Sequence, residues 1–175
     1  TITDSTQLYA SIPAGDTVTI INAFEFIISD TIPNGHQVLF GLKAEAGSTW
    51  LSEFSVSCYA HVLAVGSLTI DDSGSGNGDG KLDPGETATL LIQSMNNGNA
   101  TCANTSGTLT TTSPWVTIVS SAYPVGNLAA GAQANAQFEV QVSADAPAAT
   151  IVELEYILAS GGYHATAAFY PTIRL

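Results

Sequence analysis

The sequence predicts an all-β protein built from antiparallel β-sandwiches, and three observations support this prediction. Hydrophobic and polar residues alternate with a period of two along several segments, which is typical of half-buried strands. Glycine, proline, asparagine and serine separate these segments at short intervals. No segment keeps a 3.6-residue hydrophobic period long enough to predict a helix. Short strands punctuated in this way are typical of a seven-stranded, immunoglobulin-like sandwich.

The strands are expected in the following order. Segments 38–46 and 50–59 lie on either side of Gly47-Ser48, which predicts a first β-hairpin. Segments 68–70 and 87–93 are predicted as strands on either side of a long loop. Residues 133–142 alternate most regularly and predict a half-buried strand. Segments 152–158 and 163–170 lie on either side of Gly161-Gly162, which predicts a second β-hairpin.

The chain also repeats itself. Residues 1–15 align with residues 117–131 at an offset of 116, and from Phe24 onward the offset is 114, which aligns Leu42 with Tyr156. A change of two residues leaves the buried face of a strand unchanged. We therefore expect residues 66–175 to be a complete sandwich repeat. Residues 1–65 are expected to be the C-terminal half of an earlier repeat, which lacks about fifty residues on its N-terminal side and has an open sheet edge.

The charge balance argues against one class of partner. Fifteen Asp and Glu residues face three Lys and Arg residues, which gives a net charge of −12. Binding to nucleic acid needs basic side chains that displace counterions from the phosphates, so we expect no nucleic acid partner. No apolar run reaches the roughly 18 residues that span a bilayer, so we expect no membrane insertion.

One segment concentrates the acidic residues. Five of the fifteen Asp and Glu residues lie in the glycine-rich stretch 71–86. Like charges on a flexible loop repel one another, and ordering such a loop costs conformational entropy, so a bound cation would explain the composition. The alternative is a solvated acidic turn that binds nothing.

The spacing within 71–86 resembles the calcium loop of an EF-hand. With Ser75 at its first position, Gly80 falls where that loop requires glycine, and Glu86 falls where it has a bidentate carboxylate. Ser75 is a weaker ligand than the usual aspartate, so Asp72 or Asp71 is expected to supply the missing charge. Strands rather than helices are predicted on both sides, so the loop is not a complete EF-hand. The oxygen-rich ligand set predicts Ca²⁺, bound by Asp72, Asn77, Asp79, Lys81 through its backbone carbonyl, Asp83 and Glu86.

Several motifs together resemble a known type of domain. They are Leu68-Thr69-Ile70-Asp71-Asp72, Gly76 to Thr87, Asn96-Asn97-Gly98-Asn99, Ser113-Pro114-Trp115-Val116 and Leu128-Ala129-Ala130-Gly131. This set is similar to the tandem immunoglobulin-like repeats of large secreted bacterial proteins, including gingipain-like cysteine peptidases and related surface proteins. The resemblance implies a non-catalytic accessory or spacer module, secreted or on the cell surface. Its partners would be neighbouring domains of the same polypeptide, either catalytic or adhesive, and a peptidase or other hydrolase is one candidate for the parent protein.

A binding module for a glycan or a surface protein is a second hypothesis. Such a module would use exposed aromatic rings, which stack on sugars or on partner side chains. Tyr123 and Tyr170 each precede a proline and are the best candidates for exposure. Trp50 and Trp115 begin apolar runs and are expected to anchor a core.

An enzyme is the third hypothesis. His36, His61 and His164 lie far apart in the sequence, and neither a Gly-x-Ser-x-Gly elbow nor a cysteine nucleophile signature is present. We therefore expect no catalytic activity in this chain. Cys58 is expected to be a buried thiol, and a bridge between Cys58 and Cys102 stays open at this point.

Overall fold

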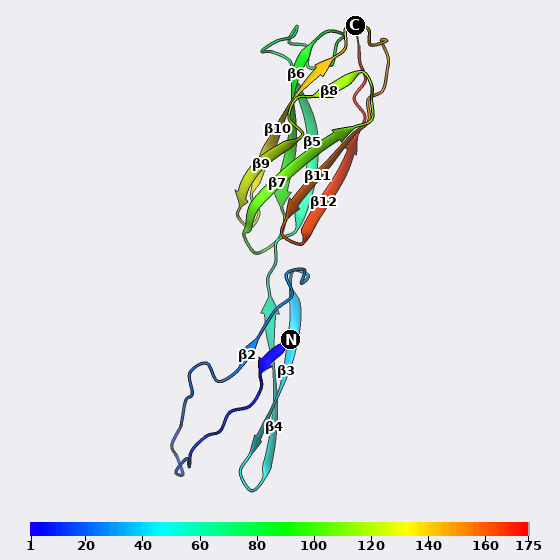
Figure 1. The fold of residues 1–175 in the computed structure, drawn as a ribbon. Coiled ribbons are helices and arrows are strands. Elements are labelled where there is room, and N and C mark those ends of the chain that lie inside the picture. Colours follow the sequence, from blue (N-terminus) through cyan, green and yellow to red (C-terminus); the bar gives the residue numbers. More distant parts are fainter. Residues whose placement is uncertain (175) are drawn as a thin grey trace. The chain divides into compact units, whose positions relative to one another are not determined.

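The computed structural model describes residues 1–174, which contain strands and no helix (Figure 1). The predicted all-β class is therefore confirmed. Within these residues no helix exists that could cross a membrane. Backbone contacts divide the chain into two compact units, Thr1–Ile32 and Pro33–Leu175. The predicted division into residues 1–65 and 66–175 stays a prediction.

The first unit contains little regular structure. Strand β1 (Ile2–Asp4) pairs antiparallel with β2 (Glu25–Phe26), and Ile2 lies opposite Phe26. The amino group of Thr1 donates a hydrogen bond of 2.9 Å to the carbonyl of Ile27. The remaining residues of this unit are turns and extended chain.

The second unit starts with a long β-hairpin, as the sequence predicts. Strands β3 (His36–Glu45) and β4 (Thr49–Cys58) pair over their whole length and form a sheet of two strands. Phe40 stacks on Phe54 across the strands, with 5.3 Å between the ring centroids. Trp50 is 56% exposed, so the expectation that it anchors a core is wrong. Its apolar run lies in a hairpin rather than in a sandwich, which leaves the ring near solvent.

The rest of the second unit is the β-sandwich. One sheet has the order β5 (Leu63–Asp71), β6 (Thr87–Asn96), β10 (Gln133–Val142) and β8 (Val116–Ile118). The other has the order β12 (Tyr163–Phe169), β11 (Leu154–Ser160), β7 (Cys102–Thr111) and β9 (Ala122–Leu128). All strand pairs in both sheets are antiparallel. The sandwich thus has eight strands among the described residues, one more than the sequence predicts.

The core lies between the two sheets, where alternate residues of β6, β10 and β11 point inward. Leu90 lies opposite Phe138, and both are buried. Phe138 meets Tyr156 of the other sheet edge to face, with 5.9 Å between the ring centroids. Burial of each such side chain stabilises the fold by roughly 1.5–3 kcal/mol. Tyr123 packs against this core, so the expectation that it is exposed is wrong; the residue lies within β9, and its Pro124 does not end the strand.

Candidate functional site

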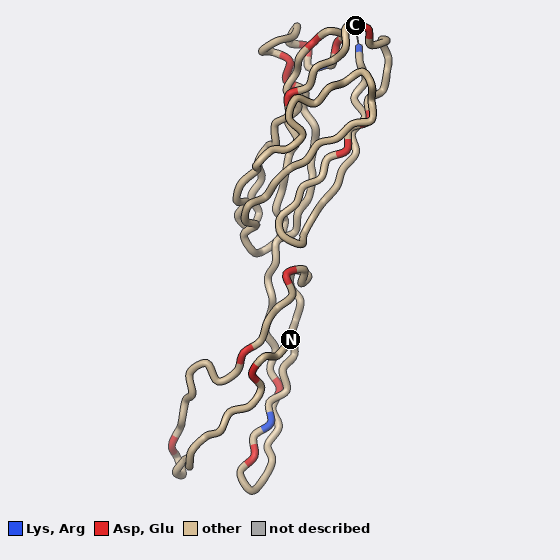
Figure 2. Tube along the Cα trace, in the orientation of Figure 1, with Lys and Arg blue, Asp and Glu red and all other residues tan. Residues whose placement is uncertain are grey.

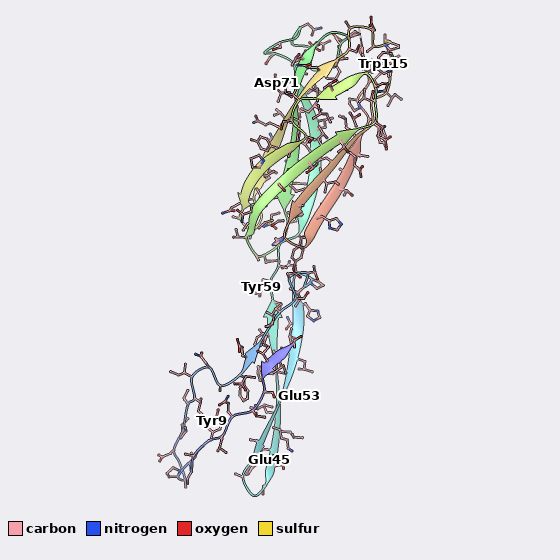
Figure 3. The ribbon with its side chains drawn as sticks, in the orientation of Figure 1. Tyr9, Glu45, Glu53, Tyr59, Asp71 and Trp115 are labelled. Atoms are coloured by element: carbon pink, nitrogen blue, oxygen red, sulfur yellow. The ribbon has the colours of Figure 1, made fainter. Side chains whose placement is uncertain are left out.

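The acidic loop connects β5 to β6 at one end of the sandwich. Figure 2 shows acidic residues gathered at this end, and Figure 3 marks Asp71 there. Two contacts hold the loop against the sandwich. Leu82 is fully buried, forms a parallel bridge with Ile173, and accepts a hydrogen bond of 2.8 Å from the Arg174 N–H. The Glu86 carbonyl accepts a hydrogen bond of 2.9 Å from the Val142 N–H.

Asp72 is the centre of the loop, and it is only 2% exposed. Its Oδ2 accepts hydrogen bonds from the N–H groups of Gly78 and Asp79 at 2.9 and 3.0 Å. Its Oδ1 accepts one from Gly80 at 3.0 Å. Burial alone raises the pKa of this carboxyl, but the backbone donors outweigh burial and hold its pKa below the ordinary value. Asp72 is therefore ionised and organises the backbone around itself.

Glu86 is the second buried carboxylate, at 7% exposed. Its Oε1 accepts a hydrogen bond of 3.0 Å from the Asn77 N–H, and its Oε2 accepts one of 3.1 Å from the Asp83 N–H. The backbone of Gly76 lies directly against this carboxylate. A Cβ at Gly76 would lie 1.6 Å from Glu86 Oε1, so any larger residue there would displace the carboxylate from its present position.

The other predicted ligands form a chain of side-chain contacts. Asn77 donates from Nδ2 to Asp83 Oδ2 at 2.7 Å and accepts at Oδ1 from the Asp79 N–H at 2.9 Å. The Lys81 ammonium pairs with Asp79 Oδ2. Asp83 Oδ1 is shielded from solvent and has no hydrogen-bond partner within residues 1–174. A buried acceptor without a partner is costly, and within residues 1–174 it is the one buried side-chain oxygen or nitrogen of the loop that has none.

The structure therefore brings most of the predicted ligands into one network. Backbone N–H groups, which the sequence analysis did not consider, supply most of the donors. Ser75 is exposed, and Asp72 rather than Ser75 bonds to Gly80. Asp71 instead accepts two hydrogen bonds from Ser73. Across residues 1–174, however, no three His, Cys, Asp or Glu side chains are grouped closely enough to hold a metal ion. Binding of Ca²⁺ stays a prediction.

The predicted aromatic candidates differ in their environment. Trp115 and Tyr123 pack against the core, whereas Tyr170 is 59% exposed. Tyr170 borders a surface groove of 640 Å³ between β5 and the end of β12. The groove is lined by hydroxyl, apolar and glycine residues: Ser67, Leu68, Thr69, Ile70, Gly80, Phe169, Tyr170 and Pro171. The Tyr170 hydroxyl lies 3.4 Å from Glu153 Oε1, which accepts its hydrogen bond.

The three histidines lie on different parts of the chain, and His36 lies opposite Cys58 in the pairing of β3 with β4. His61 lies against the ring of Tyr163, with 4.1 Å between the ring centroids, whereas His36 on β3 and His164 on β12 are exposed. Cys58 and Cys102 are both buried and free. Burial of Cys58 agrees with the prediction. The Sγ of Cys102 accepts a hydrogen bond of 3.0 Å from the Thr105 hydroxyl.

Comparison with known families identifies part of the sandwich. Residues 82–158 match the family described as NPCBM-associated, NEW3 domain of alpha-galactosidase. The match runs from the buried Leu82 of the acidic loop to Leu158 in β11. No curated protein matches the chain. The family found is that of a glycosidase-associated domain, and no comparison supports an association with gingipain-like peptidases.

Proposed function

We propose that this chain is a non-catalytic accessory module of a larger secreted or cell-surface protein, and that its acidic loop is stabilised by Ca²⁺. The match of residues 82–158 to a domain of alpha-galactosidase supports an accessory role beside neighbouring domains of one polypeptide. It favours a glycoside hydrolase over a peptidase as the parent protein. The catalytic chemistry would then belong to those neighbouring domains.

The unpartnered Oδ1 of Asp83 is the single observation that supports calcium binding most directly. This oxygen is buried and has no partner within residues 1–174. The same loop holds the buried carboxylates of Asp72 and Glu86, which form no ion pair with a basic side chain in this part of the chain. An ionised carboxylate has about four lone-pair sites. Asp72 uses three of them and Glu86 uses two, so both retain acceptor capacity without losing a backbone hydrogen bond.

Calcium binding would complete this arrangement with hard oxygen ligands. Asp72, Asp83 and Glu86 would supply charge, Asn77 and Asp79 would supply side-chain oxygens, and Lys81 would supply its carbonyl. The carboxylates would have to move closer together than they lie in the described chain. A bound ion would stabilise the fold by roughly 1–3 kcal/mol when free calcium exceeds the Kd several-fold to a hundredfold.

Thermal unfolding with calcium and with chelator tests this proposal. We expect calcium to raise Tm by about 2–8 °C, because the loop is clamped to the core at Leu82. Glu86→Gln should abolish the shift. Asp71→Asn is the matched control, because the Asp71 side chain accepts its hydrogen bonds from Ser73 in the adjacent turn, and it should keep the shift. Equal midpoints, together with metal analysis that finds no bound calcium, would reject the proposal.

Glycan binding is a second candidate function, and the exposure of Tyr170 beside the groove favours it. The ring offers a stacking surface, and Ser67 and Thr69 offer hydroxyls for a neutral, polyhydroxylated ligand. Calorimetry with galacto-oligosaccharides tests this function. Tyr170→Ala should weaken binding about tenfold, whereas Tyr59→Ala, which removes a 64% exposed ring away from the groove, should not. Identical affinities for the two variants would exclude the groove.

A further inference from the structure

The chain contains two β-hairpins that correspond to one another in the internal repeat. Hairpin β3–β4 aligns with hairpin β11–β12 at the offset of 114, so that Leu42 corresponds to Tyr156. The alignment also agrees with strand pairing elsewhere. Ile2 lies opposite Phe26 in the first unit, and their counterparts Ile118 and Val140 lie opposite each other in the sandwich. The sandwich thus provides a template for what β3 is built to contact.

The two hairpins differ in what pairs with their first strand. In the sandwich, β11 pairs with β12 on one edge and with β7 on the other. Leu154, Tyr156 and Leu158 of β11 are fully buried as a result. Within residues 1–174, β3 pairs with β4 alone, and Leu42 is 41% exposed.

One face of the hairpin is largely apolar, whereas the other mixes charged residues with the exposed Leu39 and Leu51. The apolar face carries Val38, Phe40, Leu42, Ala44, Trp50, Phe54 and Val56. The opposite face carries the charged residues Lys43, Glu45 and Glu53, and Lys43 and Glu45 form an ion pair of 2.6 Å. Glu45 and Glu53 are marked in Figure 3. An isolated two-stranded hairpin is only marginally stable, and an open edge is a template for further pairing.

We propose that the outer edge of β3 accepts an additional antiparallel strand from another polypeptide segment, with the residue pattern of β7. The register follows from the sandwich, where Leu109 of β7 lies opposite Tyr156 and Gly107 lies opposite Leu158. The incoming strand places an apolar residue beside Leu42 and a small residue beside Ala44. Its backbone hydrogen bonds give affinity, and the apolar face gives specificity, as in other cases of β-augmentation.

The probe for this edge is a synthetic peptide that copies Cys102–Thr111 with the change Cys102→Ser. Hydrogen exchange measured by mass spectrometry reports where it binds. We expect saturable slowing of exchange in residues 36–45, about tenfold at peptide concentrations up to about 1 mM. Exchange in residues 133–142 of the sandwich should not change, because β10 already has a partner on each edge.

Two variants make the test specific. Leu42→Glu places a charge on the apolar face and should abolish the slowing, whereas Leu39→Glu changes a 66% exposed residue on the opposite face and should not. The proposal would be overturned if the peptide did not slow hydrogen exchange in residues 36–45 of the wild type. It would also be overturned if both variants lost this slowing to the same extent. Slow exchange in residues 36–45 without peptide, in a concentration-dependent dimer seen by sedimentation, would also overturn it and assign the edge to a second copy of the chain. None of these outcomes depends on calcium or glycan binding.

Discussion

The hydroxyl of Ser94 lies 2.8 Å from the phenolic oxygen of Tyr156, and both side chains are buried between the two sheets. Ser94 lies on β6 and Tyr156 on β11, so this hydrogen bond joins the sheets across the core. The backbone of Gly107 lies beside the phenol, where a Cβ would come within 2.3 Å of the Tyr156 hydroxyl. Burial raises the pKa of Tyr156 above its ordinary value, so the phenol stays protonated in the core.

Removal of either partner should destabilise the sandwich. Tyr156→Phe leaves the Ser94 hydroxyl with only its long, 3.4 Å hydrogen bond to the Ile92 carbonyl, and Ser94→Ala removes the partner of the phenol. We therefore expect each change to cost about 1–3 kcal/mol of unfolding free energy. The double variant should cost less than the sum of the two single changes, because it leaves no orphaned group. Urea denaturation of the wild type, the two single variants and the double variant measures the coupling energy between Ser94 and Tyr156. Strictly additive losses of unfolding free energy would contradict the prediction.

The free energy of unfolding should decrease at low pH because Asp72 becomes protonated. Because its pKa is lower in the folded than in the unfolded chain, the unfolded state binds more protons in this range. Ionised Asp72 makes its full contribution to the free energy of unfolding when the pH is above the unfolded-state pKa of about 3.9. This contribution is lost as the pH falls through the lower pKa of the folded state. We expect urea denaturation between pH 7 and pH 2 to show that, below about pH 4, the free energy of unfolding depends less steeply on pH for Asp72→Asn than for the wild type. Asp145→Asn, at an exposed position, is the control.

A side chain at Gly76 should destabilise the loop. Gly76→Ala displaces the Glu86 carboxylate from its hydrogen bonds to the Asn77 and Asp83 N–H groups, and we expect a loss of about 1–3 kcal/mol of unfolding free energy. Gly74→Ala is the matched control in the same loop, because a Cβ there meets nothing within 4 Å. It should stay within about 0.5 kcal/mol of the wild type. Thermal or urea unfolding measures the stability of both variants. Equal losses would contradict the prediction that a side chain at Gly76 displaces the Glu86 carboxylate.

Asn96 should be the most sensitive polar residue outside the loop. Its Nδ2 donates to the carbonyls of Ala100 and Leu128, at 2.8 and 3.0 Å, and its Oδ1 accepts from the N–H groups of Val62 and Gly98. Asn96→Ala removes all of these bonds at a fully buried site, and we expect a cost of about 3 kcal/mol. The exposed neighbour provides a control, since Asn97→Ala should be close to neutral by urea denaturation.

Much of the fold could be predicted because strand alternation is a local property. The period of two in residues 133–142 places Phe138 and Val140 in the core, where the structure has them. The expectation that Trp50 is buried is wrong for a non-local reason. Alternation marks one face of a strand as apolar, but only the pairing partners of that strand decide whether the face is covered.

The candidate site could be predicted in outline only. The acidic spacing singles out residues that do form one network, including Asp72, Asp83 and Glu86. The spacing does not reveal that backbone N–H groups donate hydrogen bonds to the carboxylates of Asp72 and Glu86, because that depends on how the glycines let the chain turn. Nor does it show that Leu82 is buried under the loop, which depends on Ile173, far away in the sequence.

The bridge between Leu82 and Ile173 has a mechanical consequence. Ile173 also exchanges hydrogen bonds with the chain at Ala149 and Thr150, each 2.8 Å long. A pull applied to the chain at Arg174 therefore loads the acidic loop through Leu82 before it reaches any strand of the sandwich. The acidic loop thus shares any force on this end of the chain with residues 149–150.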